Sequence, residues 1–428
     1  MNNQTGARGV AFDLLQAVLR RHRPLDEALS DHPEIGGLEA RDRAFARLLV
    51  ATALRRLGSI DALIDARLRT PLPRQAMPVR DALRLGVAQL VFLGTPPHAA
   101  VDTTVAQVGA LGFEKLKGLA NAVLRRIAGQ GRDGSDGDPE RDTPDWLWQG
   151  WVDAYGPATA AGIAAAHRRE PPLDLTVRTD PAGWAEKLGA QLLPTGSLRL
   201  AQAGDPTALP GYAEGAWWVQ DAAAALPARL LGPIAGRPVI DLCAAPGGKT
   251  AQLAAAGAQV TAVDRSARRM ATLQANLVRL GLGAETVVAD AAEWRPAEPA
   301  AALLLDAPCS ATGTIRRHPD IAYLKRRGDM PRILETQDRL LAAAAEMLRP
   351  GGVLVYAVCS LEPAEGPDRI AAFLAGGAPF VRDPVRPEEA PALEEALDGN
   401  GGLRTLPCHW QAQGGLDGFY IARLRRRP

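Results

Sequence analysis

The sequence is poor in cysteine and has no long apolar run, and both shortages narrow the classes of protein that it can encode. None of its cysteines forms a Cys-x-x-Cys pair, and they lie far apart in 428 residues: Cys243, Cys309, Cys359 and Cys408. This spacing favours neither a zinc site nor a disulfide framework, so we predict free thiols and no metal. No stretch reaches the roughly 18 apolar residues of a membrane span, and residues 1–9 lack the apolar run of a secretory signal. We therefore expect a cytoplasmic protein that does not bind membranes.

The net charge is close to zero, but the basic and acidic residues are unevenly distributed along the chain. The chain has 49 Lys and Arg against 48 Asp and Glu, a formal charge of +1. Residues 1–129 hold 18 basic and 12 acidic residues, a balance of +6, which leaves −5 for the remainder. A basic N-terminal part suggests an anionic partner at that end. The alternative is an arginine-rich helical surface exposed to solvent.

The N-terminal part has a helical pattern almost throughout. Apolar residues recur at three- and four-residue spacing, and Pro and Gly clusters at 71–78 and 94–97 separate the helices. We predict that residues 1–129 form an all-α bundle of six or seven helices. Residues 130–143 contain no apolar side chain and many helix breakers, which predicts a flexible linker.

The rest of the chain mixes strands and helices. Residues 144–235 are predicted to form a small α+β subdomain, with strands at 173–178 and 217–219 and a tryptophan-bearing helix at 144–155 whose aromatic rings serve packing. From residue 236 to 428 strands and helices alternate, which predicts an α/β domain with a mostly parallel sheet covered on both faces. The expected strands are 239–242, 259–263, 285–289, 302–305 and 353–357, and the main helices are 250–256, 267–280 and 333–348.

The first of these strands leads into a glycine turn at the start of a helix. Gly247 and Gly248 allow a ligand to approach the backbone amides, although a tight turn without ligand is the alternative. Cys243 stands where a Walker A loop requires glycine, which argues against phosphate transfer. Asp264, Asp290 and Asp306 each follow a strand. Asp264 has the spacing that suits ribose hydroxyls, and Asp290 could accept from an adenine amino group. One such aspartate alone is usually a cap or turn residue, but three at one sheet edge favour a nucleoside site.

Two cysteines lie at the carboxyl ends of adjacent predicted strands. A lone cysteine is usually a small buried hydrophobe. Cys309 and Cys359, placed beside the same nucleoside pocket, suggest nucleophilic chemistry that uses a thiolate.

Three segments resemble a known family. Asp-Leu-Cys-Ala-Ala-Pro-Gly-Gly-Lys-Thr, Asp-Ala-Pro-Cys-Ser-Ala-Thr-Gly and Tyr-Ala-Val-Cys-Ser-Leu-Glu resemble motifs I, IV and VI of the S-adenosylmethionine-dependent RNA cytosine-5 methyltransferases (the RsmB/NOP family). The helical part, the linker and the lead-in Trp218-Val219-Gln220-Asp221 resemble the bacterial RsmB branch (Sun or Fmu), whose N-terminal domain is similar to the antitermination factor NusB. The resemblance covers nearly the whole chain, and the three motifs together are highly specific.

The resemblance implies a Rossmann-like methyltransferase domain that binds S-adenosyl-L-methionine and methylates carbon 5 of a cytosine in small-subunit (16S) ribosomal RNA, with the protein acting as a monomer. It implies Asp264 at the ribose, Asp290 at the adenine, and Asp306 near both the methionine amino group and the target base. Cys359 would be the nucleophile, and Cys309 would assist product release. The motif I loop against the methionine part of the cofactor would comprise Cys243, Ala244, Ala245, Pro246, Gly247, Gly248 and Lys249. Motif VI usually contains Thr-Cys-Ser, whereas this chain has Val358 before Cys359.

The chemistry explains the need for a thiol. Carbon 5 of cytosine is a poor nucleophile, so thiolate addition at carbon 6 is needed to activate it, and a base must later remove the carbon 5 proton. The target base must be unstacked, which favours loops or single strands. The segment after motif IV offers candidates for binding phosphates, with a solvated charge run as the alternative: Arg316, Arg317, His318, Lys325, Arg326 and Arg327.

Other functions remain open at the level of sequence. One is a catalytically silent RNA-binding protein, against which the intact cysteines and aspartates argue. Another is methylation of transfer RNA or DNA. In DNA cytosine methyltransferases the Pro-Cys cysteine, here Cys309, is the nucleophile.

Overall fold

The computed structural model describes residues 6–129, 137–201 and 204–428. The chain forms two compact units, one comprising residues 1–169 with 315–326 and the other residues 170–314 with 327–428. Within the described ranges, no helix is both long and apolar enough to cross a membrane.

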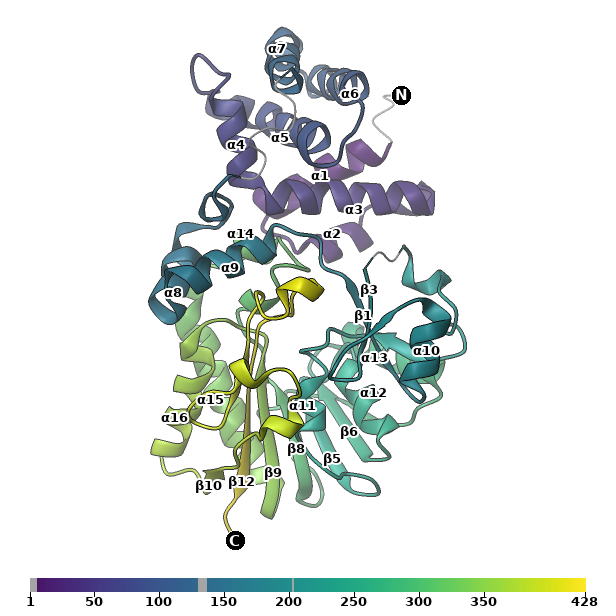
Figure 1. The fold of residues 1–428 in the computed structure, drawn as a ribbon, viewed down its shortest axis with the longest axis vertical. Helices are drawn as coiled ribbons and strands as arrows, with labels where there is room; N and C mark the ends of the chain where they lie inside the picture. Colours follow the sequence, from purple (N-terminus) through teal and green to yellow (C-terminus); the bar gives the residue numbers. More distant parts are fainter. Residues whose placement is uncertain (1–5, 130–136, 202–203) are drawn as a thin grey trace. The chain divides into compact units, whose positions relative to one another are not determined.

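The first unit is all-helical over its N-terminal part, as predicted (Figure 1). Its helices pack around one apolar core to which Leu14, Leu49 and Leu83 each contribute a fully buried side chain. The helices are α1 (Ala7–Leu19), α2 (Leu25–Ser30), α3 (Ala40–Arg55), α4 (Leu57–Asp65), α5 (Met77–Val87), α6 (Pro97–Ala110) and α7 (Lys117–Ala128).

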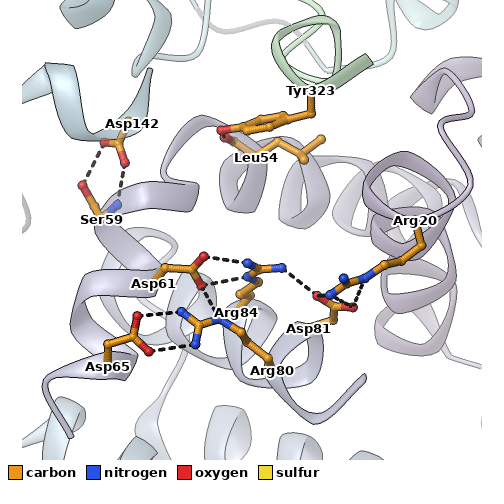
Figure 2. A network of polar contacts seen from close by, with 10 residues as sticks. All are labelled: Arg20, Leu54, Ser59, Asp61, Asp65, Arg80, Asp81, Arg84, Asp142 and Tyr323. Atoms are coloured by element: carbon orange, nitrogen blue, oxygen red, sulfur yellow. Dashed lines mark hydrogen bonds and ion pairs between the residues drawn. The ribbon is translucent and has the colours of Figure 1, made fainter. Parts of the chain in front are cut away.

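A chain of ion pairs ties α4 and α5 to the end of α1 (Figure 2). Asp61 accepts hydrogen bonds from Arg80 at 3.1 Å and from Arg84 at 2.6 Å. Arg84 also donates to Asp81 at 2.8 Å, and Arg20 donates to the same carboxylate at 3.0 Å. Asp81 is fully buried, so these two guanidinium groups supply the charge that a buried carboxylate needs.

The predicted linker is only partly described, because its residues 130–136 lie outside the described ranges. The part that is described does not have the character of a free linker. It forms η5 (Pro139–Asp142), and Asp142 accepts from the Ser59 amide at 2.7 Å and from the Ser59 hydroxyl at 2.9 Å. This carboxylate therefore caps the N-terminus of α4 from 83 residues away.

The compact units also depart from the predicted boundaries. Helices α8 (Asp145–Tyr155) and α9 (Pro157–His167) pack with the helical unit, although residues 144–235 were expected to form one subdomain. Residues 315–326, which include α14 (Ile321–Leu324), belong to the same unit. Two long-range bonds explain this placement, from Tyr323 Oη to the Leu54 carbonyl and from the Leu25 amide to Asp320, each 2.9 Å.

The second unit begins with a small antiparallel sheet of order β2-β3-β1-β4. Asp174 and Arg199 form a buried two-bond ion pair across β1 and β3, with both distances 2.7 Å. The elements are β1 (Leu173–Val177), α10 (Pro181–Leu188), β2 (Gln191–Leu192), β3 (Leu198–Leu200) and β4 (Trp217–Val219).

The main sheet has the order β10-β12-β9-β8-β5-β6-β7, and β5 to β9 run parallel, as predicted (Figure 1). In register, Leu242 lies opposite both Val263 and Leu305, and Asp306 lies opposite Ala357. The carboxyl ends of these strands therefore meet at one edge. The strands are β5 (Pro238–Leu242), β6 (Gln259–Asp264), β7 (Glu285–Val288), β8 (Ala300–Asp306) and β9 (Leu348–Val358).

Helices cover both faces of this sheet. Successive side chains of a strand alternate between faces, so Leu304 and Val355 pack toward α11 and α12 while Leu303 and Leu354 pack toward α15 and α16. The covering helices are α11 (Leu226–Arg229), α12 (Gly248–Ala255), α13 (Ala267–Leu280), α15 (Met330–Met347) and α16 (Pro367–Ala375). The layered α/β architecture predicted from the alternation is confirmed.

Three C-terminal strands were not predicted. β12 (Phe419–Arg426) runs antiparallel to β9 from Tyr420 to Arg425, and it also pairs with β10 (Phe380–Arg382) and β11 (Leu403–Thr405). Most of β12 is buried on both faces, so its sequence lacks the alternation of a half-exposed strand.

Candidate active site

The turn after β5 is a tight loop that only glycine can complete. Cys243 has φ of 60° and Gly247 has φ of 103°, and α12 begins at Gly248. A Cβ atom on Gly247 would lie 2.7 Å from the Cγ of Leu273 on α13. Glycine is therefore required here both for its backbone conformation and for close helix packing.

Asp264 holds this turn against the end of β6. Its two carboxylate oxygens accept from the Ala245 amide at 3.1 Å and from the Ser266 amide at 2.9 Å, and the residue is 3% exposed. Arg269 donates to the Ala245 carbonyl and lies 3.7 Å from the Asp264 carboxylate. Asp264, predicted to bind the ribose, thus also shapes the loop beside it. Each of its carboxylate oxygens retains a lone pair for a ligand.

A cavity of about 300 Å³ opens beside Asp264. Its volume is at the lower end of the range for small-molecule sites. Three of the predicted cofactor residues line it, Cys243, Asp264 and Asp290, whereas Ala244 to Lys249 form the adjacent turn and do not line it. The sequence did not predict the part of the wall that comes from α15, which includes Arg332, Glu335, Thr336, Arg339 and Leu340.

This cavity has the hydrogen-bond acceptors that an adenosine-like ligand needs. Asp264 ends β6, 16 residues past Gly248, and Asp290 follows β7. An acidic residue near the Asp264 position binds the ribose in open α/β sheets. Burial, followed by the charges of Asp306 and Asp264, raises the pKa of the Cys243 thiol, which disfavours its thiolate form. The residues present therefore fit a nucleoside cofactor.

Lys249 forms an ion pair with Asp306. The Nζ atom of Lys249 donates to Asp306 at 2.7 Å and lies 5.2 Å from the centre of the Phe419 ring on β12. Burial favours the neutral amine, but the charge of Asp306 and the hydrogen bond to it outweigh burial and raise the pKa of Lys249. Lys249 therefore stays charged at neutral pH.

The two cysteines of the predicted site lie side by side. Cys309 follows β8 and Cys359 follows its parallel neighbour β9, and their Sγ atoms are 3.4 Å apart. A further bond from the Gly313 amide to the Cys359 carbonyl, 3.0 Å, joins the two loops. The hydrogen bond to Cys359 and burial raise the pKa of Cys309 well above its usual value, so this sulfur keeps its proton at neutral pH.

The residue before Cys359 is part of the apolar core of the sheet. Val358 is fully buried in the cluster that faces α15, together with Tyr356 and Leu354. A threonine at this position would direct its side chain into the same apolar layer. The difference from the usual motif VI therefore concerns the core of the sheet.

The structure contradicts part of the predicted phosphate-binding segment. Arg316 is only 1% exposed, and its carbonyl accepts from Arg55 at 2.9 Å, so it does not offer a guanidinium at the surface. His318 is paired with Asp26 at 3.2 Å. Burial within the helical unit explains why Arg316 is not a phosphate ligand. The His318 side chain is 44% exposed, and its partner Asp26 occupies it.

A basic hollow of about 670 Å³ occurs elsewhere in the helical unit. It is lined by Arg67 and Arg69, after α4, and by Arg126 at the end of α7. Arg69 and Arg126 are exposed. Guanidinium groups gathered in this way attract phosphates.

Both parts of the chain match known families. The model described as 16S rRNA methyltransferase RsmB/F matches residues 228–425, and the NusB family model matches residues 5–129. Ribosomal RNA small subunit methyltransferase B of Pseudomonas putida is 38% identical over 97% of this chain and 98% of its own length. The protein of the same name from Klebsiella pneumoniae is 34% identical over 100% of both chains.

A solved structure supports the fold over the same extent. The crystal structure of PH0851 covers 98% of this chain and 99% of its own, with a TM-score of 0.74 and 23% sequence identity. Because the full-length relatives span the helical unit as well as the sheet with its paired cysteines, the chain belongs to the ribosomal RNA small subunit methyltransferase B (RsmB) family.

Proposed function

We propose that this chain transfers a methyl group from S-adenosyl-L-methionine to carbon 5 of a cytosine in small-subunit ribosomal RNA. The observation that carries the proposal is the 3.4 Å separation of the Cys309 and Cys359 sulfurs at the ends of two adjacent parallel strands. Family membership supports the substrate class, since the named relatives are ribosomal RNA small subunit methyltransferases.

The cofactor would be held by the cavity beside the glycine turn. When bound, S-adenosyl-L-methionine supplies an electrophilic methyl group. Asp264 would accept hydrogen bonds from its ribose, and Asp290 would accept from its adenine amino group. The turn from Cys243 to Lys249 would contact the methionine part. The volume and the carboxylates of the cavity support this assignment.

Cys359 would be the nucleophile. Its thiolate adds to carbon 6 of the cytosine, which places electron density on carbon 5 and makes that atom reactive toward the methyl group. Asp306, at the end of β8, would hydrogen-bond the cytosine edge and favour the addition. Lys249 donates to this carboxylate at 2.7 Å and so fixes its position.

Cys309 would act after methyl transfer. A base removes the carbon 5 proton, and the Cys359 sulfur then leaves carbon 6 to regenerate the aromatic ring. A protonated Cys309 sulfur 3.4 Å away can donate a hydrogen bond to the departing Cys359 thiolate and so ease its release.

The RNA would approach with its target cytosine unstacked, at a cost of a few kcal/mol. The basic N-terminal part would bind phosphates, through side chains such as Arg69 and Arg126. We expect this activity in the cytoplasm, since its substrate is ribosomal RNA.

The test is methylation of 16S ribosomal RNA that lacks the modification. Wild-type protein is incubated with labelled S-adenosyl-L-methionine, and the labelled nucleotide is identified and mapped. We expect label at carbon 5 of one cytosine and none with the Cys359→Ser variant. Label on transfer RNA alone, or no label with a protein that binds the cofactor, would overturn the proposal.

A further inference from the structure

Behind the two cysteines lies a buried carboxylate that the chemistry above does not use. Glu365 ends η9 (Pro363–Glu365), six residues after Cys359, and it is fully buried. Its backbone carbonyl accepts from the Tyr356 hydroxyl at 2.7 Å, which anchors η9 to β9. The backbone at Glu365 is therefore fixed to the sheet.

The carboxylate of Glu365 bonds to both cysteine loops. One oxygen accepts from the Ser310 amide at 2.9 Å, and the other accepts from the Ser360 hydroxyl at 2.6 Å. Ser310 and Ser360 are the residues that directly follow Cys309 and Cys359. The two serine hydroxyls also lie 3.0 Å apart. One side chain thus links the loops at the residues next to the sulfurs.

A third donor attaches this link to α15. Gln337 Nε2 donates to Glu365 at 2.9 Å and to the Pro308 carbonyl at 3.0 Å. The three donors to the Glu365 carboxylate are an amide, a hydroxyl and a carboxamide, so the carboxylate is held by neutral groups. Burying a carboxylate is costly, and an apolar side chain of similar volume would often be as stable. Stability alone therefore does not explain a carboxylate at this position, whereas its hydrogen bonds to both cysteine loops do.

We propose that Glu365 is a positioning residue that holds the Cys309 and Cys359 loops together, so that the Cys309 sulfur stays within hydrogen-bonding reach of the Cys359 sulfur. The proposal rests on the function proposed above for the two cysteines. A carboxylate suits this task because each oxygen accepts from a different loop and neither bond requires the other to break. The same charge contributes to the raised pKa of Cys309, after the hydrogen bond with Cys359, burial and the charge of Cys359.

The test compares Glu365→Gln and Glu365→Ala with a matched control. Glu389→Gln is the control, because Glu389 is also a well-bonded carboxylate of the same unit but contacts Arg423, at 2.6 and 2.9 Å. We expect both Glu365 variants to bind S-adenosyl-L-methionine within threefold of wild type. Their kcat should fall about 100-fold, the effect of a misplacement of about 1 Å, while KM for the RNA changes less than threefold. The control should keep its kcat.

A second readout measures the cysteine geometry without the methylation reaction. Hydrogen peroxide converts two thiols into a disulfide and two molecules of water, and mass spectrometry quantifies the peptide that joins Cys309 to Cys359. We expect this bond to form at least tenfold more slowly in both Glu365→Gln and Glu365→Ala than in wild type, and at an unchanged rate in the control. Because the readout needs no RNA, it decides the positioning role even if wild-type protein methylates no RNA, which would count against the proposed function alone.

Ser360→Ala provides an independent variant if Glu365→Ala does not fold. It removes the bond to one carboxylate oxygen and keeps the buried acid. We expect a smaller fall in kcat and a slower disulfide in the same direction. The proposal is overturned if the folded Glu365→Gln protein forms the disulfide at the wild-type rate, or if its kcat stays within threefold of wild type.

Discussion

Asp241, on β5 just before the cofactor turn, predicts a dependence of stability on pH. The residue is fully buried, and its Oδ2 accepts from the Thr250 hydroxyl at 2.6 Å. Its Oδ1 is buried and has no hydrogen-bond partner among the described residues. Burial raises the pKa of Asp241 to about 7, assisted by the charges of Asp306 and Asp264, while the bond from Thr250 opposes the rise.

The sign follows from proton binding. Between pH 4 and pH 7 the folded state holds the Asp241 proton while the unfolded state has lost it, so the stabilisation that protonation provides is present below pH 4 and is lost as pH rises through 7. A rise from 3.8 to about 7 corresponds to at most about 4 kcal/mol. Asp241→Asn removes the titration and keeps the shape. The free energy of unfolding of the variant, relative to wild type, should therefore increase by up to about 4 kcal/mol from pH 4 to pH 8.

The assay is urea unfolding at several pH values, followed by circular dichroism. Thr250→Val is the companion variant, because loss of its hydroxyl removes the bond that favours the ionised form. It should raise the pKa of Asp241 further and extend to higher pH the range over which stability falls. A difference between wild type and Asp241→Asn that stays constant within about 0.5 kcal/mol from pH 4 to pH 8 would refute the reasoning, since a shift of even one pKa unit is worth 1.36 kcal/mol.

Three further predictions concern the cofactor, the RNA and the helical unit. Asp264→Ala and Asp290→Ala should each weaken binding of S-adenosyl-L-methionine by about 1.5 to 3 kcal/mol. The larger loss is expected at Asp264, because it also holds the turn. Affinities equal to that of wild type, measured by calorimetry, would refute this. RNA binding should weaken with salt, and replacing both Arg69 and Arg126 by alanine should reduce the slope of log K against log salt by about 1.4, whereas an unchanged slope would remove the basic hollow from the RNA site. Asp142→Ala should destabilise the protein by about 1 to 2 kcal/mol in thermal unfolding, and an unchanged melting temperature would show that the cap is dispensable.

Local signals in the sequence predicted the parts of the fold that local interactions determine. The helix expected at 267–280 has those bounds in the structure, because Ser266 caps its start and Gly281, with φ of 60°, ends it. Strand ends were equally informative. Parallel strands bring their carboxyl ends to one edge, so Asp264 and the two cysteines could be assigned to one region from their positions after strands.

Long-range packing determined what the sequence did not predict. β12 pairs with β9, whose partner residues lie more than 60 positions earlier in the chain, and its burial on both faces hides the alternating pattern. Arg316 lies in a run of charges that suggested a surface, yet it packs inside the helical unit. Glu365 was missed because a single glutamate near a motif gives no sign that its oxygens will link two separate loops.

The central claim is that Cys359 attacks the base and Cys309 releases the product, and trapping the covalent adduct tests it most directly. Wild-type, Cys309→Ala and Cys359→Ser proteins are incubated with unmethylated 16S ribosomal RNA and S-adenosyl-L-methionine, and protein–RNA adducts are resolved on a denaturing gel. The account predicts a shifted band that accumulates with Cys309→Ala, because addition occurs but elimination is slow, and no band with Cys359→Ser, whose hydroxyl is a far weaker nucleophile. A band that accumulates with Cys359→Ser and is lost with Cys309→Ala would contradict the account and assign the nucleophile to Cys309.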